Sequence, residues 1–112
     1  MTKYSLLIII ILYNTVLFSQ EKSNDKFIIK GEVIDELSNP IEYSTVVLFN
    51  KKDSSFVIGT TTDKKGKFKL DKIKAGNYYL KCDFLGYKTY IINDISGQLE
   101  FQTIKLKQII QN

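Results

Sequence analysis

The sequence has no histidine, no arginine and no tryptophan, and it contains one cysteine and one proline. Without histidine there is no imidazole base to activate a serine or a thiol, and one cysteine is too few for a zinc cluster or an intramolecular disulfide. Cys82 alternates with Leu80 and Phe84, so we expect a buried apolar side chain rather than a nucleophile. These absences predict a protein without catalytic residues, metal or cofactor.

The lack of arginine also argues against nucleic acid as a binding partner. All 16 basic residues are lysines, and with 12 carboxylates they give a net charge of +4. Arginine is the side chain best suited to bidentate recognition of bases and phosphates. The lysines are spread among acidic residues along strands and turns, as on an ordinary solvated surface. We therefore expect no nucleic-acid partner.

The N-terminus has the pattern of an export signal. Lys3 precedes an apolar run from Leu6 to Leu12, and the apolar character ends near Ser19. A positive start, a short apolar region and a small residue before a polar one are typical of a secretory signal peptide. We predict a signal peptide over residues 1–19, a flexible leader over residues 20–26, and export to the periplasm or outer membrane. The alternative is an uncleaved membrane anchor.

The remainder shows short runs in which apolar and polar residues alternate, with no helical period. The strongest run places Tyr78, Leu80, Cys82 and Phe84 on one face. Between two runs, Asp63 and Gly66 predict a tight turn. The expected strands cover residues 27–35, 43–50, 56–61, 67–71, 78–84, 88–92 and 99–106, the last with a bulge or break between Phe101 and Ile104. Six or seven such strands predict an all-β sandwich.

The second expected strand is apolar on both faces. If Val46 and Leu48 point into the core, the side chains of Thr45, Val47 and Phe49 point outward, because side chains alternate along a strand. A small two-sheet sandwich has no third layer to cover them, so we predict an interaction face at these three positions. The alternative is that the loop at residues 93–98 folds over them.

The order of these motifs resembles the carboxypeptidase regulatory-like domain, a transthyretin-like, immunoglobulin-like Greek-key β-sandwich. The resemblance spans roughly residues 27–106. It is carried by Gly31-x-Val33-x-Asp35, Pro40-Ile41-x-Tyr43-Ser44-Thr45-Val46, Thr62-Asp63-x-x-Gly66-x-Phe68, Gly76-x-Tyr78-x-Leu80 and Gly86-Tyr87. Asn39 and Ser44 differ from the glycine and alanine that are common at these positions.

The resemblance implies a non-catalytic domain over residues 27–107, followed by a tail over residues 108–112. Similar domains often lie at the N-terminus of outer-membrane β-barrel proteins and TonB-dependent receptors of Bacteroidota-type bacteria. The implied role is docking to an outer-membrane or periplasmic protein, or self-association. The chain is then either free-standing or the severed leader of a receptor.

Two alternative sites depend on individual residues. Tyr79, Tyr87 and Tyr90 are a candidate aromatic platform for a glycan, which makes a carbohydrate-binding module the runner-up function. The loop that starts at Asp63 loosely resembles a calcium loop, but it lacks the alternating oxygen ligands, so a turn is the better interpretation.

Overall fold

The structure is a computed structural model that describes residues 25–110 of the 112-residue chain. The predicted signal peptide, residues 1–19, and nearly all of the predicted leader lie outside the described residues. Residues 25–110 contain no helix, hence none that could cross a membrane. They form the strands β1 (Lys26–Ile34), β2 (Thr45–Asn50), β3 (Phe56–Thr61), β4 (Lys67–Lys74), β5 (Tyr78–Asp83), β6 (Tyr90–Ile95) and β7 (Gln102–Lys105).

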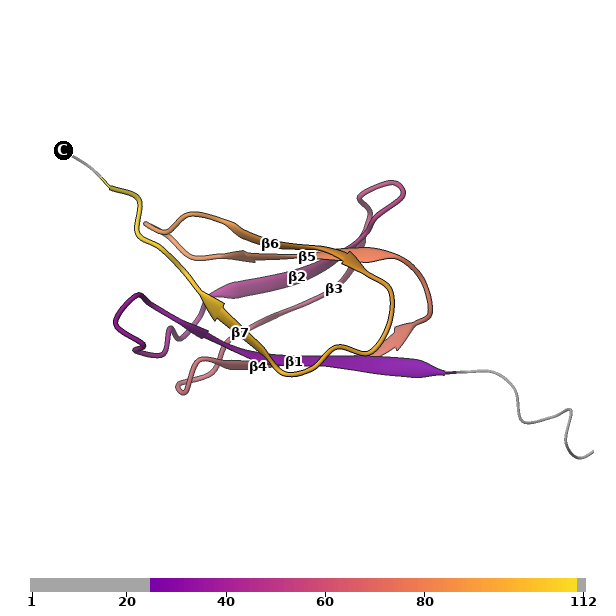
Figure 1. Cartoon of the computed structure of the whole chain (residues 1–112), viewed down its shortest axis with the longest axis horizontal. Coiled ribbons are helices and arrows are strands. Elements are labelled where there is room, and N and C mark those ends of the chain that lie inside the picture. Colours follow the sequence, from indigo (N-terminus) through magenta and orange to yellow (C-terminus); the bar gives the residue numbers. More distant parts are fainter. Residues whose placement is uncertain (1–24, 111–112) are drawn as a thin grey trace, which may run out of the picture.

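The seven strands form two stacked sheets, which confirms the predicted β-sandwich (Figure 1). One sheet has three strands in the order β4-β1-β7, and the other has four in the order β3-β2-β5-β6. Neighbouring strands are antiparallel except β1 and β7, which are parallel. β3 and β4 lie at the edges of their sheets, so the chain changes sheet between them.

The core lies between the two sheets and follows the alternation of the strands. Along β5 the side chains of Tyr78, Leu80 and Cys82 are buried, and the residues between them are half-buried on the other face. The same period-2 pattern buries one face of β1 and of β2. The fully or almost fully buried apolar residues include Ile29, Val33, Val46, Leu48, Leu70, Ile73, Leu80, Cys82, Ile95, Ile104 and Leu106.

β4 continues past the expected end at Asp71 because it contains a bulge. Ile29 pairs with Leu70 and Phe27 pairs with Ile73, so two residues of β4 oppose one residue of β1. Lys72 at this point has a positive φ of 56°. The bulge resets the alternation, and Leu70 and Ile73 both face the core although they are three residues apart.

β6 differs from the expected strand at residues 88–92, and it also contains a bulge. Tyr78 pairs with Ile95 and Leu80 with Ile92, so β6 also has one extra residue there. Asp94 adopts a positive φ of 58°. β7 begins directly after Phe101, so the irregularity expected between Phe101 and Ile104 is the start of the strand.

Phe84 packs against the core, but the expectation that it belongs to a central strand is wrong. β5 ends at Asp83, and Phe84 is half-buried at the margin of the core. The Tyr87 N–H donates to the Phe84 carbonyl at 3.0 Å, and Gly86 has a φ of 89°. Phe84 therefore opens the turn, and its ring packs on the Tyr87 ring with centroids 5.8 Å apart.

The pairing of β1 with β7 depends on Gly31. A Cβ at this position would lie 2.4 Å from the Gln102 carbonyl oxygen and 2.7 Å from the Phe68 ring. Gly31 pairs with Gln102 on one side and with Phe68 on the other. The missing side chain thus lets the Phe68 ring cross the middle of the three-stranded sheet.

Candidate interaction surface

The outer face of the four-stranded sheet holds the three residues predicted as an interaction face. Val47 on β2 pairs with Gly59 on β3 and with Lys81 on β5, and Lys81 pairs with Ile91 on β6. Residues directly opposite one another in a ladder point to the same side. Thr45 is exposed, Val47 and Lys81 are half-buried, and Ile91 is 48% exposed. One row of side chains therefore crosses the whole sheet on this face.

Aromatic rings form the next row of the same face. Phe49 pairs with Tyr79, and their rings stack with centroids 5.1 Å apart and an interplanar angle of 20°. On the other side of Val47, a Cβ at Gly59 would lie 3.3 Å from both the Phe56 ring and Val47, so the Phe56 ring lies over Gly59. We call Val47, Phe49, Phe56, Tyr79 and Ile91 the outer aromatic face.

The loop that follows β6 runs toward the opposite sheet and not over the outer aromatic face. Gln98 Nε2 donates to the Ile28 carbonyl at 2.6 Å, and Gln98 Oε1 accepts the Ile28 N–H at 3.2 Å. Ile28 belongs to β1 in the opposite sheet. Figure 1 shows the segment after β6 sweeping toward β1. Residues 93–95 belong to β6, and residues 96–98 run to the end of the sandwich, so this segment does not fold over Val47 and Phe49.

The three tyrosines proposed as a sugar platform are not brought together. Tyr90 pairs with the buried Cys82, so it lies on the opposite side of the sheet from Tyr79, which is three residues before Cys82. Tyr87 is half-buried, packs on Phe84, and forms a bridge with Gln108. Only Tyr79 belongs to an aromatic cluster on the outer side of the sheet.

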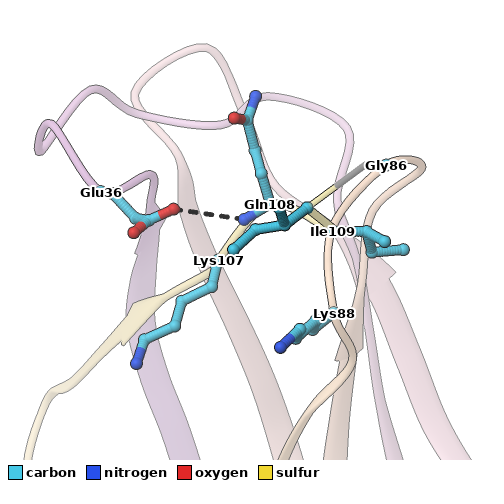
Figure 2. Close-up of a pocket in the computed structure, with 7 residues that line it drawn as sticks. Glu36, Gly86, Lys88, Lys107, Gln108 and Ile109 are labelled. Atoms are coloured by element: carbon cyan, nitrogen blue, oxygen red, sulfur yellow. Dashed lines mark hydrogen bonds between the residues drawn. The ribbon is translucent and has the colours of Figure 1, made fainter. Parts of the chain in front are cut away.

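A groove of about 620 Å³ lies at one end of the sandwich, between the β1–β2 turn and the segment after β7 (Figure 2). Figure 2 shows the Glu36 carboxylate directed at the Gln108 backbone nitrogen, which donates to it at 3.3 Å. The Ile109 N–H donates to the Gly86 carbonyl at 3.0 Å. Hydrogen-bonded structure therefore continues to Ile109, past the expected domain end at residue 107. Exposed lysines and one carboxylate are the ionisable groups of this groove, and they provide no activated nucleophile.

The Asp63 loop forms the predicted turn. Asp63 Oδ1 accepts the N–H groups of Lys65 and Lys67, each at 2.9 Å, and Gly66 has a φ of 74°. The hydrogen bond from the Lys67 N–H, above all, lowers the pKa of the Asp63 carboxyl. One carboxylate oxygen is therefore already engaged by the backbone. Among residues 25–110, no three histidine, cysteine, aspartate or glutamate residues are grouped so that they could hold a metal.

Cys82 lies in the core between the sheets, where none of its surface is exposed. Burial raises the pKa of its thiol from 9.0 to about 11. A neutral, inaccessible thiol is a packing group and not a nucleophile. Its position agrees with the alternation read from the sequence.

Sequence reasoning missed two residues of the outer aromatic face, Phe56 and Ile91. Ile91 stands between Tyr90 and Ile92, so a run of three apolar residues concealed which one faces outward. Phe56 joins this face because the β2–β3 register shifts between Leu48 and Phe49 and pairs Phe56 with Phe49. A signal was present at Gly59, since a glycine inside a strand often marks a close approach by a neighbouring group.

Solved structures share this fold at low sequence identity. The chain is similar to 3-chlorocatechol 1,2-dioxygenase from Rhodococcus opacus 1CP (12% identity, TM-score 0.58), with 80% of this chain and 62% of that one covered. It is similar to the Bacillus anthracis TIE protein (18%, TM-score 0.58), with 75% and 17% covered. It is also similar to a chain of a type II cohesin–X-dockerin complex from Acetivibrio cellulolyticus (16%, TM-score 0.58), with 73% and 58% covered. The chain thus spans less than two thirds of each of these proteins, and the likeness establishes the fold alone.

A search of curated proteins gives no match. The model of the carboxypeptidase regulatory-like domain, in contrast, matches residues 28–106. That range runs from the third residue of β1 to the residue after β7, so all seven strands contribute to it. It also agrees with the motifs at Gly31, Asp63 and Gly86. On this match the chain belongs to the carboxypeptidase regulatory-like domain family, a family of regulatory, non-catalytic β-sandwich modules.

Proposed function

We propose that the protein is an exported, non-catalytic docking module that binds a protein of the periplasm or outer membrane through its outer aromatic face. The observation that carries the proposal is the stacked pair of Phe49 and Tyr79, half-buried on a sheet face over which residues 25–110 place no further layer. Clustered apolar side chains on the surface of a small domain are a common mark of an interaction site.

Two further points support a docking role. Lys81 stands inside the apolar cluster, next to Val47 and Ile91, and Asp83 follows on the same side of β5, so charged groups on this face can fix the orientation of a partner. One of the similar folds was solved in a cohesin–X-dockerin complex, so this sandwich architecture is compatible with a protein interface. The apolar run before Ser19 supports export.

The test is a Val47→Glu, Phe49→Lys double variant of the full chain, with folding followed by circular dichroism and urea unfolding. We expect a folded variant, because both side chains are only half-buried. Pull-down from envelope extract, read by mass spectrometry, should lose the proteins that the wild-type chain retains. N-terminal sequencing of the protein from the envelope fraction should begin at Gln20 and so test the predicted cleavage after Ser19.

A matched control exchanges two charges on the outer side of the other sheet, Lys30→Glu with Glu32→Lys. Like the test variant, it leaves the net charge unchanged, and both positions lie on β1 away from the outer aromatic face. It should retain every partner of the wild-type chain. A folded Val47→Glu, Phe49→Lys variant that keeps all wild-type partners would reject the outer aromatic face as the docking surface.

The carbohydrate-binding alternative now depends on Tyr79 alone, since Tyr90 lies on the opposite side of the sheet. Its stacked neighbour Phe49 gives Tyr79 a fixed orientation, which a sugar-stacking ring requires. A glycan array with the wild-type chain and with Tyr79→Ala tests this function. Specific glycan binding that is lost in Tyr79→Ala would place carbohydrate binding ahead of protein docking.

A further inference from the structure

The edge strand β3 differs from the other three sheet edges in having no charge. Its sequence is Phe-Val-Ile-Gly-Thr-Thr, and within residues 25–110 it pairs only with β2. Edge strands usually carry charges, bulges or short lengths that prevent pairing with another chain. The edge strand β4 has four lysines, β6 has Asp94, and β7 is four residues long and includes Lys105, whereas β3 has a bulge at Val57 but no charged residue.

The backbone of β3 offers hydrogen bonds at its outer side. The Thr62 N–H donates to the Ser44 carbonyl, at 3.0 Å, directly after the strand. Because the bonding direction alternates along an antiparallel pair, the N–H and C=O groups of Thr61 and Gly59 point away from β2. Among residues 25–110, no other strand pairs with this side. An added strand can therefore bind there through main-chain hydrogen bonds.

A groove of about 320 Å³ lies beside this edge, where β3 and β4 face each other across the sandwich. Apolar side chains of both sheets line it, from Val57, Ile58, Ile73 and Tyr78. A strand that pairs with β3 has every second side chain pointing toward the β4 side, and hence toward this groove. Strand addition of this kind takes its affinity from the backbone and its specificity from such pockets.

The charge around this edge indicates the partner. Residues 51–74, which comprise β3, β4 and the adjoining turns, contain eight lysines and three aspartates, a net charge of +5. The whole chain has a net charge of +4, so the rest of the sequence is slightly acidic. Lys72 and Lys74 line the groove itself, together with one carboxylate, Asp71. Two copies joined edge to edge at β3 would place two such basic segments next to each other, which disfavours self-pairing.

We infer that the β3 edge and its groove bind an extended acidic segment of a partner protein as an added strand. The segment has apolar side chains at alternate positions, which enter the groove, and carboxylates that face Lys72 and Lys74. This inference rests on the proposed docking function. It specifies the kind of partner segment that binds, and it assigns that segment to a second surface next to the outer aromatic face.

The test uses the full chain and three fluorescein-labelled peptides. The first alternates valine and threonine and has two glutamates at each end; the second has lysines in place of the glutamates; the third is the first with a central proline. Fluorescence anisotropy should give at least about tenfold tighter binding of the first peptide than of the other two. Binding of the first peptide should be weaker at about 0.15 M ionic strength than at low ionic strength. Hydrogen exchange should slow at the Gly59 and Thr61 amides when the first peptide is bound.

Two charge-reversal variants distinguish binding at the β3 edge from non-specific attraction by the net charge of the protein. Lys72→Glu with Lys74→Glu should lose the acidic peptide and gain the lysine peptide. The matched control, Lys88→Glu with Lys107→Glu, changes the net charge equally at the distant groove of Figure 2 and should retain the wild-type preference. A third variant, Val57→Glu, places a carboxylate in the groove and should also lose the acidic peptide.

Equal binding of the three peptides, or loss of binding in the Lys88→Glu, Lys107→Glu control, would overturn the inference. So would a dimer in analytical ultracentrifugation that itself protects the Gly59 and Thr61 amides. If the peptides fail but the Val47→Glu, Phe49→Lys variant still loses envelope partners, the edge site is rejected and the docking function stands. If the peptides bind as expected while that variant keeps every partner, docking through the outer aromatic face is rejected and the edge remains the binding surface.

Discussion

The rings of Phe49 and Tyr79 stack across two neighbouring strands, with centroids 5.1 Å apart and planes inclined by 20°. Both side chains are half-buried, and they lie on the sheet face opposite the core. The pair is therefore placed by strand register and not by the packing of the interior. It fixes two aromatic rings in one orientation on the surface of a small domain.

The Phe49–Tyr79 contact should contribute a measurable coupling energy. We expect Phe49→Leu and Tyr79→Leu to be non-additive by about 1 kcal/mol, because an aromatic cross-strand pair gains more than its buried area alone provides. Urea unfolding of the two single variants and the double variant gives the value. Additive losses would mean that the stacked geometry contributes no energy of its own.

The register of β5 predicts that alanine substitutions at adjacent residues lower the free energy of unfolding by very different amounts. Leu80 is fully buried between the sheets, so Leu80→Ala should lower the free energy of unfolding by roughly 2–5 kcal/mol. Lys81 points outward, and Lys81→Ala should cost within about 0.5 kcal/mol. Phe84→Ala should cost less than Leu80→Ala, since Phe84 lies beyond the strand and is half-buried. Equal losses in urea melts would contradict the register.

Gly31 should tolerate no side chain. Gly31→Ala places a Cβ 2.4 Å from the Gln102 carbonyl oxygen, and we expect a loss of about 3 kcal/mol or a failure to fold. Gly97→Ala is the control, because nothing lies within 4 Å of the Cβ added there. Thermal unfolding of both variants is the measurement. A Gly31→Ala protein as stable as Gly97→Ala would show that β1 and β7 are not held together as described.

Asp63 should make the stability of the protein decrease as the pH falls into the acid range. The pKa of its carboxyl is lowered in the folded protein, so the stabilisation is present above the unfolded value of 3.8 and is lost as the pH falls through the folded pKa. The wild-type chain should therefore be more stable than Asp63→Ala at neutral pH, and the difference should shrink in acid. Urea midpoints at several pH values test this. A difference between the two proteins that stays constant from neutral pH into acid would contradict this role of the Asp63 carboxylate.

Cys82 should make the stability of the protein depend on pH in the alkaline range. Because burial raises the pKa of its thiol from 9.0 to about 11, the unfolded chain ionises first and stability falls as the pH rises through that interval. The difference in unfolding free energy between wild type and Cys82→Ala isolates this contribution from those of tyrosines and lysines. At neutral pH the thiol should react with a thiol reagent only as fast as the protein unfolds. Fast labelling of the folded chain would contradict a buried Cys82.

Local patterns in the sequence were sufficient to predict the strands and the turn at Asp63. Alternation at Tyr78, Leu80 and Cys82 reports directly on which side chains enter the core, and the Asp63–Gly66 turn is built from bonds between residues close in sequence. The outward position of Val47 and Phe49 followed from the same rule. Such features require no knowledge of which strands pair.

The parts that could not be predicted depend on contacts between distant segments. The bulges at Lys72 and Asp94 exist because a neighbouring strand has one residue fewer at that place, which no local pattern records. Phe56 joins the outer aromatic face through a register shift against β2, and Ile91 through its pairing with Lys81. Phe84 is the opposite case: its alternation continues, but the turn at Gly86 has already ended the strand.

The parallel pairing of β1 and β7 determines how the domain would carry a mechanical load. The chain enters β1 at one end of the sandwich and leaves β7 toward the other (Figure 1). Tension that separates the two ends would slide these strands past each other, and the hydrogen bonds from Gly31–Gln102 to Ile34–Lys105 would have to break together. A strand pair loaded in this shear direction resists force far better than one that unzips bond by bond. Used as a tether, the domain would thus bear tension between its two ends while remaining folded.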